Sequence, residues 1–585
     1  MRLMRQPETS ASEFPVTPDQ LRYILAETLT QANYMQPASW VIDGPLDVAR
    51  FEAAIGKVVA RHEMLRVSLV RKRGQGYLNR VHESPRIEIE QLALPEWDPV
   101  AVRKAIEACA YRPHNFLESE LARFQLIRIG TQRHVFTTLF HHALTDALSG
   151  GIFRRELSMF YEGREPDTTP VAYRDFFAGN REPPADRRQA EAFWQDYLAD
   201  FDGEGSLPAD FRPEQPSSEM DFLEFRLDAS LSARAREAAR QLGVSPFALY
   251  STVYSVLLGR HTGASSVISL IQSAGRRGYA GSEQTCGLFS KALVLITRWS
   301  EEMPFAELAR ATRKNIGLCL QNEAVPYQEV VSDSGIKARF GINWLPGRQD
   351  FDLQGCQVTR QYFVFAQSDH DLNFRIVDDA QGVLLYLAFN RSQFLRSRVE
   401  EFAHQFVALL GDACTDPQCA IAALGVTQRS RRVPPAVLPP VRESAAELVH
   451  ELFLRQARLH PQATAIECAE QRWSYRELER ASDTIMAGLH DRGIAPGATL
   501  AVLARRTPGL VAALLAVLRM GCAFAILDSA YPPRRLRQCV DMLRPGGIIV
   551  CEEQEVPDEL VCAAQESECF LLHLDQEIGR ASCRE

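Results

Sequence analysis

The 585-residue sequence lacks the signals of a secreted, membrane-spanning or nucleic-acid-binding protein. Its N-terminus, MRLMRQPETSASEF, contains no apolar core of the kind that a secretion signal needs. The longest apolar stretch, Leu510 to Leu527, is interrupted by Arg519 and Gly521, which is typical of a helix that leads into a buried strand. The formal net charge of −9 offers no excess of cations for nucleic acid. We therefore expect a soluble, cytoplasmic protein that has neither nucleic acid nor a membrane as a partner.

Paired cysteines are also missing. The 13 cysteines are scattered, odd in number and never form a CxxC motif. This pattern favours reduced thiols over a disulfide framework or a zinc site, and we expect no bound metal. Internal repeats and low-complexity tracts are absent as well. The fractions of hydrophobic (46%) and charged (24%) residues are ordinary for a globular protein.

The first 430 residues predict a two-lobed α/β domain. A chain of 585 residues is too long for one hydrophobic core, so we expect roughly two to four domains. Residues 1–15 are polar and are predicted to be flexible. From residue 16 to 430 the expected helices and strands alternate, which is typical of α/β layering. The stretch NREPPAD predicts a boundary between an N lobe, 16–182, and a C lobe, 183–430.

A proline-rich segment separates this domain from a second one. Residues 431–446 are predicted to be a stiff linker, because RRVPPAVLPPV contains four prolines. Residues 447–577 begin with a helix and continue as alternating strands and helices, which favours a parallel sheet. The tail, 578–585 (IGRASCRE), matches no preceding pattern and resembles a translated sequencing adapter. We expect this tail to be an artefact and the gene to continue beyond it.

Histidine is scarce, with 13 in the chain, yet two are adjacent at His141 and His142 and are followed by Asp146. The preceding run, His134 to Phe140 (HVFTTLF), is rich in β-branched and aromatic residues and predicts a buried strand. The segment that follows, GIFRRELSMFYEG, has apolar residues at helical spacing. HHALTDALSG therefore occupies a strand-to-helix turn, where a rigid scaffold can present an imidazole to a substrate.

An imidazole at this turn can take a proton from an attacking amine or alcohol. Two other interpretations compete. Both histidines can be packing residues at a strand end, and a metal site would need a third ligand from a distant part of the chain. Because side chains alternate along a strand, only one of His141 and His142 can face a cavity. Asp146 is better suited to fixing the turn by pairing with a buried arginine than to acting on a substrate.

Residues 16–430 resemble a condensation domain of nonribosomal peptide synthetases, whose signature is HHxxxDG. Six further segments match motifs of that family in the expected order along the chain. They are Thr17–Leu25 (TPDQLRYIL), Arg61–Leu69 (RHEMLRVSL), Val171–Gly179 (VAYRDFFAG), Ser273–Gly278 (SAGRRG), Cys286–Leu293 (CGLFSKAL) and Asn322–Val331 (NEAVPYQEVV). Seven ordered matches exclude the interpretation of both histidines as mere packing residues.

The resemblance implies an α/β fold of two lobes, each similar to chloramphenicol acetyltransferase, that form a V around a tunnel. It implies that phosphopantetheine arms of two carrier domains enter the tunnel, with no covalently bound cofactor. Because the sequence shows no carrier domain upstream, we expect the donor to arrive in trans or as an acyl-CoA or acyl carrier starter, and the acceptor to come from a carrier downstream in the full-length protein. An acceptor amine would attack a donor thioester and give an amide. The same resemblance makes His142 the catalytic or positioning imidazole and His141 structural, and it pairs Asp146 with an arginine, for which we nominate Arg276. With Ala147, the next residue, these two histidines and Asp146 form the candidate catalytic segment.

Three departures from the family motifs bear on this expectation. Ala147 replaces the glycine of the signature; alanine keeps a backbone N–H that can stabilise a tetrahedral oxyanion, unless the position needs a positive φ. Lys291 replaces an asparagine and is expected to place a charge in a segment that borders the passage between the lobes. Glu323 and Ala324 replace the Gln-Asp pair of another motif.

Residues 447–577 resemble the start of an adenylation domain, an α/β adenylate-forming fold. Trp473–Ser482 (WSYRELERAS) and Leu518–Leu536 (LRMGCAFAILDSAYPPRRL) match two of its early motifs. The Ser/Thr/Gly-rich phosphate loop that ends in Lys-Gly, the later ATP-contacting motifs and the catalytic lysine do not occur in the sequence. We therefore expect an incomplete and inactive domain, since ATP and Mg²⁺ would bind only to a complete one.

The sequence thus predicts an amide-forming acyltransferase, and one alternative stays open. A condensation fold with drifted chemistry could be a non-catalytic platform that recruits carrier domains or tailoring enzymes. The presence of His142 and Asp146 speaks against it, whereas Ala147 and Lys291 speak weakly for it. Relatives with other reactions fit less well: heterocyclisation needs Asp in place of the first histidine, epimerisation domains follow a carrier, and a plant-type acyltransferase carries DFGWG.

Overall fold

The computed structural model shows two compact units. The described residues are 12–30, 33–83, 87, 89–112, 117, 121–178, 184–199, 201, 207–211, 217, 219–332, 336, 338–345, 351–363, 370–379, 382–426, 448–468, 471–551 and 556–574. The first unit contains nearly all of those up to residue 426, and the second contains those from 448 onward. The predicted linker, 431–446, and the predicted artefact, 578–585, lie outside the described residues.

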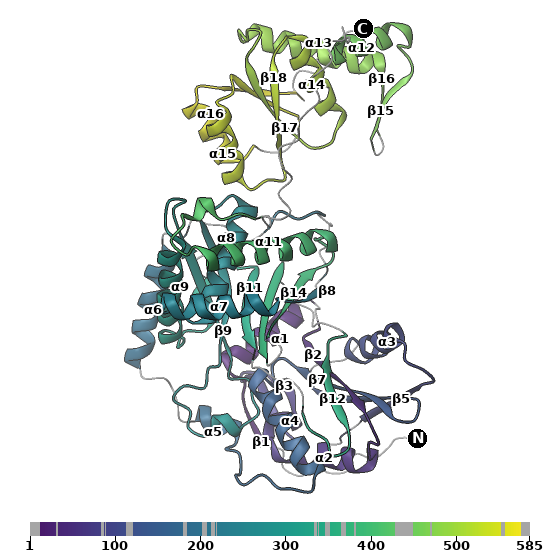
Figure 1. The fold of residues 1–585 in the computed structure, drawn as a ribbon, viewed down its shortest axis with the longest axis vertical. Helices are drawn as coiled ribbons and strands as arrows, with labels where there is room; N and C mark the ends of the chain where they lie inside the picture. Colours follow the sequence, from purple (N-terminus) through teal and green to yellow (C-terminus); the bar gives the residue numbers. More distant parts are fainter. Residues whose placement is uncertain are drawn as a thin grey trace. The chain divides into compact units, whose positions relative to one another are not determined.

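A five-stranded mixed sheet forms the N lobe, in the order β12-β2-β7-β6-β5 (Figure 1). Its strands are β2 (Met35–Asp43), β5 (Ile89–Leu94), β6 (Ala122–Ile129), β7 (Arg133–His141) and β12 (Gln357–Gln361). β5 and β6 are parallel, and the other neighbours are antiparallel. β7 lies at the centre of the sheet, and every residue after its first is buried. The prediction of a buried strand before the paired histidines is confirmed.

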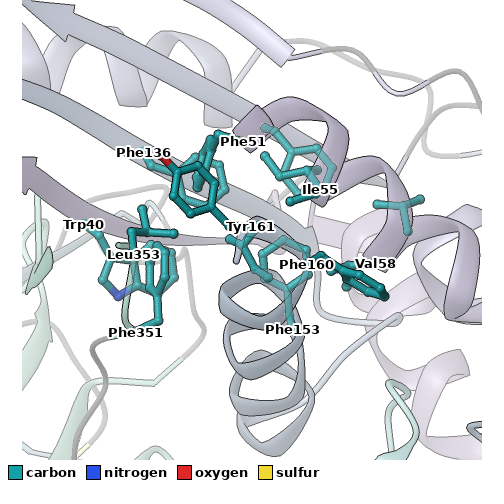
Figure 2. Packing of buried hydrophobic residues seen from close by; sticks show 14 of the residues in the cluster. Trp40, Phe51, Ile55, Val58, Phe136, Phe153, Phe160, Tyr161, Phe351 and Leu353 are labelled. Atoms are coloured by element: carbon teal, nitrogen blue, oxygen red, sulfur yellow. The ribbon is translucent and has the colours of Figure 1, made fainter. Parts of the chain in front are cut away.

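Three helices of the N lobe pack their apolar faces on this sheet: α2 (Val48–Arg61), α3 (Pro99–Ala110) and α4 (Ala147–Tyr161). A fourth helix, α1 (Pro18–Thr30), contributes Ile24 to a separate buried cluster with Met64 and Leu144. The buried side chains of α2 follow the helical repeat: Phe51, Ala54, Ile55, Val58 and Val59. Phe51 and Ile55 belong to one buried cluster with Phe153 and Phe160 of α4 and Phe136 of β7 (Figure 2). The Phe51 and Phe136 ring centroids are 4.8 Å apart in an edge-to-face arrangement, which is favourable for aromatic pairs.

The motif segment TPDQLRYIL contains the start of α1. Pro18 is the first residue of α1, and Thr17 precedes it. The Gln20 N–H donates to Thr17 Oγ1 (3.3 Å), and the Thr17 N–H donates to Gln20 Oε1 (3.0 Å). This reciprocal capping satisfies two backbone donors that the first turn of a helix cannot pair internally.

A three-stranded antiparallel sheet, β1-β4-β3, corrects the expectation for the N-terminus. Its strands are β1 (Ser12–Pro15), β3 (Val67–Lys72) and β4 (Gly76–Val81); a short 3-10 turn, Glu63–Arg66, precedes β3. The prediction that residues 1–15 are flexible is therefore wrong for Ser12–Pro15, while residues 1–11 are outside the described ranges. Glu13 forms ion pairs with Arg80 (3.0 Å) and Lys72. A polar segment is ordered here because its backbone completes a sheet edge and its charge is paired.

A six-stranded sheet forms the C lobe, in the order β10-β9-β11-β13-β14-β8. Its strands are β8 (Met220–Arg226), β9 (Ser266–Ser273), β10 (Lys291–Arg298), β11 (Phe340–Leu345), β13 (Leu372–Asp379) and β14 (Gly382–Asn390). The helices between residues 173 and 415 are α5 (Tyr173–Ala178), α6 (Pro184–Ala199), α7 (Ala229–Leu242), α8 (Pro246–Thr262), α9 (Phe305–Gln321), α10 (Tyr327–Ser332) and α11 (Arg396–Thr415). Tyr254 of α8 stacks on Phe374 of β13 at 5.4 Å, and Phe406 of α11 lies 4.6 Å from the same ring. α7 and α8 follow each other directly and form a helix pair.

Among the described helices, none is both long and apolar enough to cross a membrane alone. α7 and α8, which are bent by 102° at the break between them, reach the length and apolar composition of a membrane span only when the two helices are taken together. Tyr250, Tyr254 and Leu257 of α8 are buried in the core of the C lobe.

β12 modifies the predicted division into lobes at residue 182. This strand comes from the C-terminal half of the domain, yet it pairs antiparallel with β2 over Gln357–Gln361, and Figure 1 shows it among the strands of the N lobe. Phe351, which precedes it, packs edge-on against Trp40 of β2 at 5.4 Å (Figure 2). The N-lobe sheet is thus completed by residues that the sequence interpretation assigned to the C lobe.

The second unit has a four-stranded parallel sheet in the order β18-β17-β19-β20. Its elements are α12 (Val449–Leu459), β15 (Thr464–Cys468), β16 (Gln471–Ser474), α13 (Tyr475–Asp491), β17 (Thr499–Ala504), α14 (Pro508–Arg519), β18 (Ala523–Asp528), α15 (Pro533–Leu543), β19 (Gly547–Val550), α16 (Asp558–Glu566) and β20 (Phe570–His573). One core contains residues of α13 and α14, and another contains residues of α15 and α16, so helices cover both faces of the sheet. The predicted alternation of strands and helices around a parallel sheet is confirmed.

Candidate functional site

β7 ends at His141, His142 follows it, and α4 begins five residues after His142, so the predicted strand-to-helix turn is present. His141 is fully buried, and its Nε2 lies 2.7 Å from Glu27 Oε2. Its Nδ1 accepts the Ala143 N–H at 3.1 Å. Both ring nitrogens of His141 are therefore used within the scaffold, as its predicted structural role requires.

His142 points the other way, into a cavity, as the alternation along a strand predicts. Its ring stacks on Tyr23 of α1 with centroids 4.1 Å apart and an interplanar angle of 14°. The Tyr23 hydroxyl lies 3.2 Å from His142 Nε2. Burial lowers the pKa of His142 from 6.5 to about 3, and the nearby positive charges of Arg22 and Arg375 act in the same direction. The imidazole is therefore neutral at physiological pH.

Asp146 is the N-cap of α4 and an ion-pair partner at the same time. Its Oδ1 accepts the Ser149 N–H at 2.8 Å, which caps the helix. Arg276 Nη2 donates to both carboxylate oxygens, at 2.9 and 3.0 Å, and the Phe289 N–H donates to Oδ2 at 3.2 Å. The Asp146 and Arg276 side chains are only 3% and 9% exposed. The buried arginine nominated from the sequence is thus in contact with Asp146, and the pair joins the turn to the C lobe.

The glycine before Arg276 explains how this arginine reaches the turn. Gly275 has φ +62°, and a Cβ at this position would lie 1.7 Å from Phe289 O. Only glycine fits there, because both the backbone conformation and the space exclude a side chain. Arg276 also lies over the Phe289 ring, with its guanidinium carbon 4.2 Å from the centroid, and Nη1 donates to Thr285 O at 2.9 Å. The Gly-Arg pair therefore holds the segment 285–289.

Other motif residues fasten the same segment to the N lobe. Ser149 Oγ donates to Gly287 O (2.8 Å), and Tyr173 Oη donates to Leu288 O (2.7 Å). His62 Nε2 lies 2.9 Å from Glu156 Oε2, and its Nδ1 accepts the Cys286 N–H at 3.4 Å. The segments RHEMLR and VAYRDF thus act as structural contacts between the lobes.

The cavity beside His142 has a volume of about 520 Å³ and is lined by residues of both lobes. Asp146, Ala147 and Tyr23 line it from the N lobe, and Trp344 and Arg375 from the C lobe. Sequence reasoning missed Tyr23, Trp344 and Arg375. Tyr23 is within the quoted segment TPDQLRYIL, but it lies three residues after the buried Gln20, so the helical repeat places both on one face and does not single out Tyr23. Trp344 and Arg375 carry no local sequence signal.

The three departures from the family motifs have local explanations. Ala147 is the first residue of α4, and it is not among the described residues with positive φ, so a glycine is not needed there. Lys291 is not among the described residues that line the cavity, although its neighbour Ser290 is. Its Nζ donates to Glu323 O at 3.0 Å, and the Glu323 carboxylate accepts from Ser273 Oγ. Two of the departures, Lys291 and Glu323, therefore contact each other.

Comparisons with known proteins agree with this fold. The family model of the condensation domain matches residues 10–432, and that of the AMP-binding enzyme matches 453–581. Surfactin synthase subunit 2 of Bacillus subtilis (strain 168) is 25% identical over 575 residues, which cover 94% of this chain and 16% of the relative. The chain thus spans about a sixth of that relative's length.

Two solved structures are similar in fold. A crystal structure of a four-domain nonribosomal peptide synthetase bound to AMP and glycine matches 98% of this chain and 45% of its own, with 17% identity and a TM-score of 0.64. The first condensation domain of the calcium-dependent antibiotic synthetase, in complex with a substrate analogue, matches 71% of this chain and 99% of its own, with 19% identity and a TM-score of 0.63. The chain therefore belongs to the condensation-domain family of nonribosomal peptide synthetases, whose members are amide-forming acyltransferases, and a partial AMP-binding domain follows its condensation domain.

Proposed function

We propose that this chain forms an amide bond between a carrier-bound acyl or peptidyl thioester and a carrier-bound aminoacyl group, with His142 as the residue that orients the reacting amine. The single observation that carries the proposal is the placement of a neutral His142 imidazole on the wall of a cavity between two lobes, at a turn that the Asp146–Arg276 pair holds in place. In the reaction the acceptor nitrogen attacks the thioester carbonyl carbon, the C–S bond breaks, and the proton that the nitrogen loses leaves with the thiol.

The state of His142 favours positioning over complete proton transfer. An α-amino group ordinarily has a pKa of about 8, far above the pKa of about 3 that His142 has in this site. Full transfer of a proton from an ammonium group to this imidazole is therefore unfavourable. A neutral imidazole instead accepts a hydrogen bond from the free amine and directs its lone pair to the carbonyl. Orientation of two tethered reactants can lower the activation free energy by several kcal/mol, which is as much as or more than general base catalysis contributes.

Ala147 completes the proposed site through its backbone. It is the first residue of α4, and the N–H groups of a first helical turn have no intrahelical acceptor. The positive end of the helix dipole also favours a negative charge there. A thioester carbonyl that faces this turn would have its developing oxyanion stabilised, and alanine supplies the same N–H as the glycine of the family signature.

Turnover by the full chain tests the proposal. Donor and acceptor N-acetylcysteamine thioesters are supplied to the wild type and to His142→Ala, and the amide is quantified by mass spectrometry. We expect His142→Ala to reduce the rate by at least about 100-fold with an unchanged circular dichroism spectrum. His404→Ala, at an exposed position of α11, is the matched control and should retain full activity. Unchanged turnover in His142→Ala would contradict the role of His142, and an inactive wild type would favour the non-catalytic platform.

The partners follow from the same proposal. Carrier domains deliver the donor and acceptor on phosphopantetheine arms, with the donor arriving in trans. These arms belong to the carrier domains and hold the substrates; they are not cofactors attached to this chain. Purified donor carrier added in trans should support amide formation, whereas the same carrier without its phosphopantetheine should not.

We further propose that the AMP-binding part makes no aminoacyl adenylate. The 585 residues contain no Ser/Thr/Gly-rich loop that ends in Lys-Gly and could hold a triphosphate. Amino-acid-dependent exchange of pyrophosphate into ATP measures this half-reaction directly. No exchange is expected with any proteinogenic amino acid, and exchange above the no-enzyme background would refute the proposal.

A further inference from the structure

Two asparagines on neighbouring strands of the C lobe line the cavity beside His142. Asn343 is on β11 and Asn373 is on β13. Arg375 is opposite Asn343 in the ladder, and its positive charge adds to burial in lowering the pKa of the His142 imidazole. Such an effect requires a short separation. The two asparagines are therefore on the part of the wall that is close to the reacting groups.

The carboxamides of Asn343 and Asn373 are on the same face of the sheet. In the parallel β11–β13 ladder Gly341 is opposite Asn373, and Asn343 is two residues further along β11. Side chains two residues apart on a strand point to one face. A Cβ at Gly341 would lie 3.1 Å from Asn373 Nδ2 and 3.2 Å from Asn373 Cγ. The carboxamide of Asn373 thus lies over Gly341, which is about 6.6 Å from Asn343 along the strand.

Both asparagines have an acceptor without a partner. The Oδ1 atoms of Asn343 and Asn373 are buried and have no hydrogen-bond partner among the described residues. Asn373 as a whole is only 8% exposed. Buried amide oxygens are normally paired, and an unpaired one destabilises the folded protein. Rotation about χ2, which is soft in asparagine, can turn either oxygen toward the cavity. Two acceptors are thus available to a group that enters the cavity.

One NH2 group matches this pair of acceptors. A primary carboxamide carries two N–H donors on one nitrogen, whereas a hydroxyl or a main-chain amide carries one. Two oxygens that accept from the same NH2 lie about 5 Å apart, close to the separation of the two side chains along β11.

An ammonium group fits the site less well than a carboxamide, because its buried charge needs a carboxylate partner. Asp146 is the one carboxylate among the described residues that line the cavity, and it is bound to Arg276 at 2.9 Å. A neutral donor avoids this cost.

We propose that one of the two condensed groups carries a side-chain carboxamide, and that its NH2 donates to Asn343 Oδ1 and Asn373 Oδ1. The inference rests on the proposed amide-forming function and names the substrate class of the same site. A site of this kind selects strongly, because an analogue that lacks the N–H groups leaves both buried oxygens unpaired.

Matched substrate pairs that differ only by NH2 against CH3 test the proposal. The full chain is given N-acetylcysteamine thioesters: succinamoyl against 4-oxopentanoyl as donor, and asparaginyl against 2-amino-4-oxopentanoyl as acceptor. The other reactant is held constant within each pair. We expect kcat/KM for the carboxamide member of at least one pair to exceed that of its ketone by about tenfold or more. Asn343→Leu and Asn373→Leu should each bring this ratio close to one.

The control removes a carboxamide elsewhere. Gln241→Leu, at an exposed position of α7, should leave the ratio unchanged. The leucine variants should also keep or raise the urea midpoint of the empty protein, because each removes an unpaired acceptor without leaving a void. An alanine variant of the same residue replaces any leucine variant that does not fold.

Each further outcome decides between the explanations. Equal kcat/KM within both pairs, or a preference that survives in both leucine variants, overturns the proposal. If these variants lose activity equally with both members of a pair, the asparagines bind the amide of the N-acetylcysteamine arm, which every substrate carries, and the proposal fails. If the wild type condenses none of the substrates, calorimetry with the same thioesters separates the two proposals. Tenfold tighter binding of the carboxamide that is lost in Asn373→Leu then supports the carboxamide site while the amide-forming function fails, and equal binding refutes the carboxamide site.

Discussion

Replacing Asp146 by alanine should destabilise the condensation domain far more than the loss of an ordinary helix cap. The side chain is 3% exposed and accepts from Ser149, Arg276 and Phe289. Loss of an N-cap costs about 1 kcal/mol. Removal of one partner of a buried ion pair costs roughly 3–5 kcal/mol, because the other charge stays buried. We expect a total of roughly 4–6 kcal/mol, which is a large part of the stability of a typical domain.

Urea denaturation followed by intrinsic fluorescence measures this loss, and three variants separate its parts. Asp47→Ala removes the N-cap of α2, whose exposed carboxylate accepts the Arg50 N–H at 3.1 Å, and should cost only about 1 kcal/mol. Asp146→Asn keeps a capping oxygen but loses the charge, so its stability should fall between the wild type and Asp146→Ala. Adding Arg276→Met to Asp146→Ala should recover about 2 kcal/mol, since the unpaired cation is then gone. An Asp146→Ala loss no greater than that of Asp47→Ala, or strict additivity with Arg276→Met, would refute the reasoning.

Three further predictions concern the same turn. Gly275→Ala should lower the free energy of unfolding by more than about 3 kcal/mol, because its Cβ would lie 1.7 Å from Phe289 O. Gly278→Ala, at φ +83° but in open space, should lower it by only about 1 kcal/mol. Thermal denaturation of the two variants compares these losses. The pKa of His142 is about 3 in the folded protein against an ordinary 6.5, so between these values the unfolded chain binds a proton that the folded protein does not, and the free energy of unfolding falls as pH drops from 6.5 toward 3. In urea titrations over that pH range, His142→Asn should lose less stability than the wild type. Equal losses would contradict the lowered pKa of His142. Tyr23→Phe keeps the stacked ring at 4.1 Å from His142 and should reduce amide formation less than Tyr23→Ala. An equal loss in both variants would show that the hydroxyl, not the stacking, holds the imidazole.

The strand-to-helix turn could be predicted from sequence because its determinants are local. A run of β-branched and aromatic residues indicated the buried strand, and apolar residues at helical spacing indicated α4. Alternation along a strand predicted that only one of His141 and His142 faces a cavity, and the family resemblance assigned that position to His142. The parallel sheet of the second unit followed from the same periodicities. The catalytic role of His142 stays a prediction.

Features that depend on contacts between distant segments could not be predicted. Nothing in the polar sequence of Ser12–Pro15 shows that it would complete a sheet with β4. The contact between Lys291 and Glu323 joins positions 32 residues apart, and each residue alone only departs from a motif. The wall of the cavity has the same origin, since Arg360 and Arg375 come from different sheets and neither belongs to a recognisable motif.

The exchange of β12 into the other lobe's sheet means that the two lobes are not separable as genetic units. A fragment that ends at residue 182 would lack Gln357–Gln361 and would leave β2 as an open edge with unpaired backbone groups. Such a fragment should aggregate or dimerise through that edge. A synthetic peptide with the sequence of β12 should bind to the open edge of β2 in this fragment. Strand pairing, and not the order of residues along the chain, therefore sets where this domain can be divided.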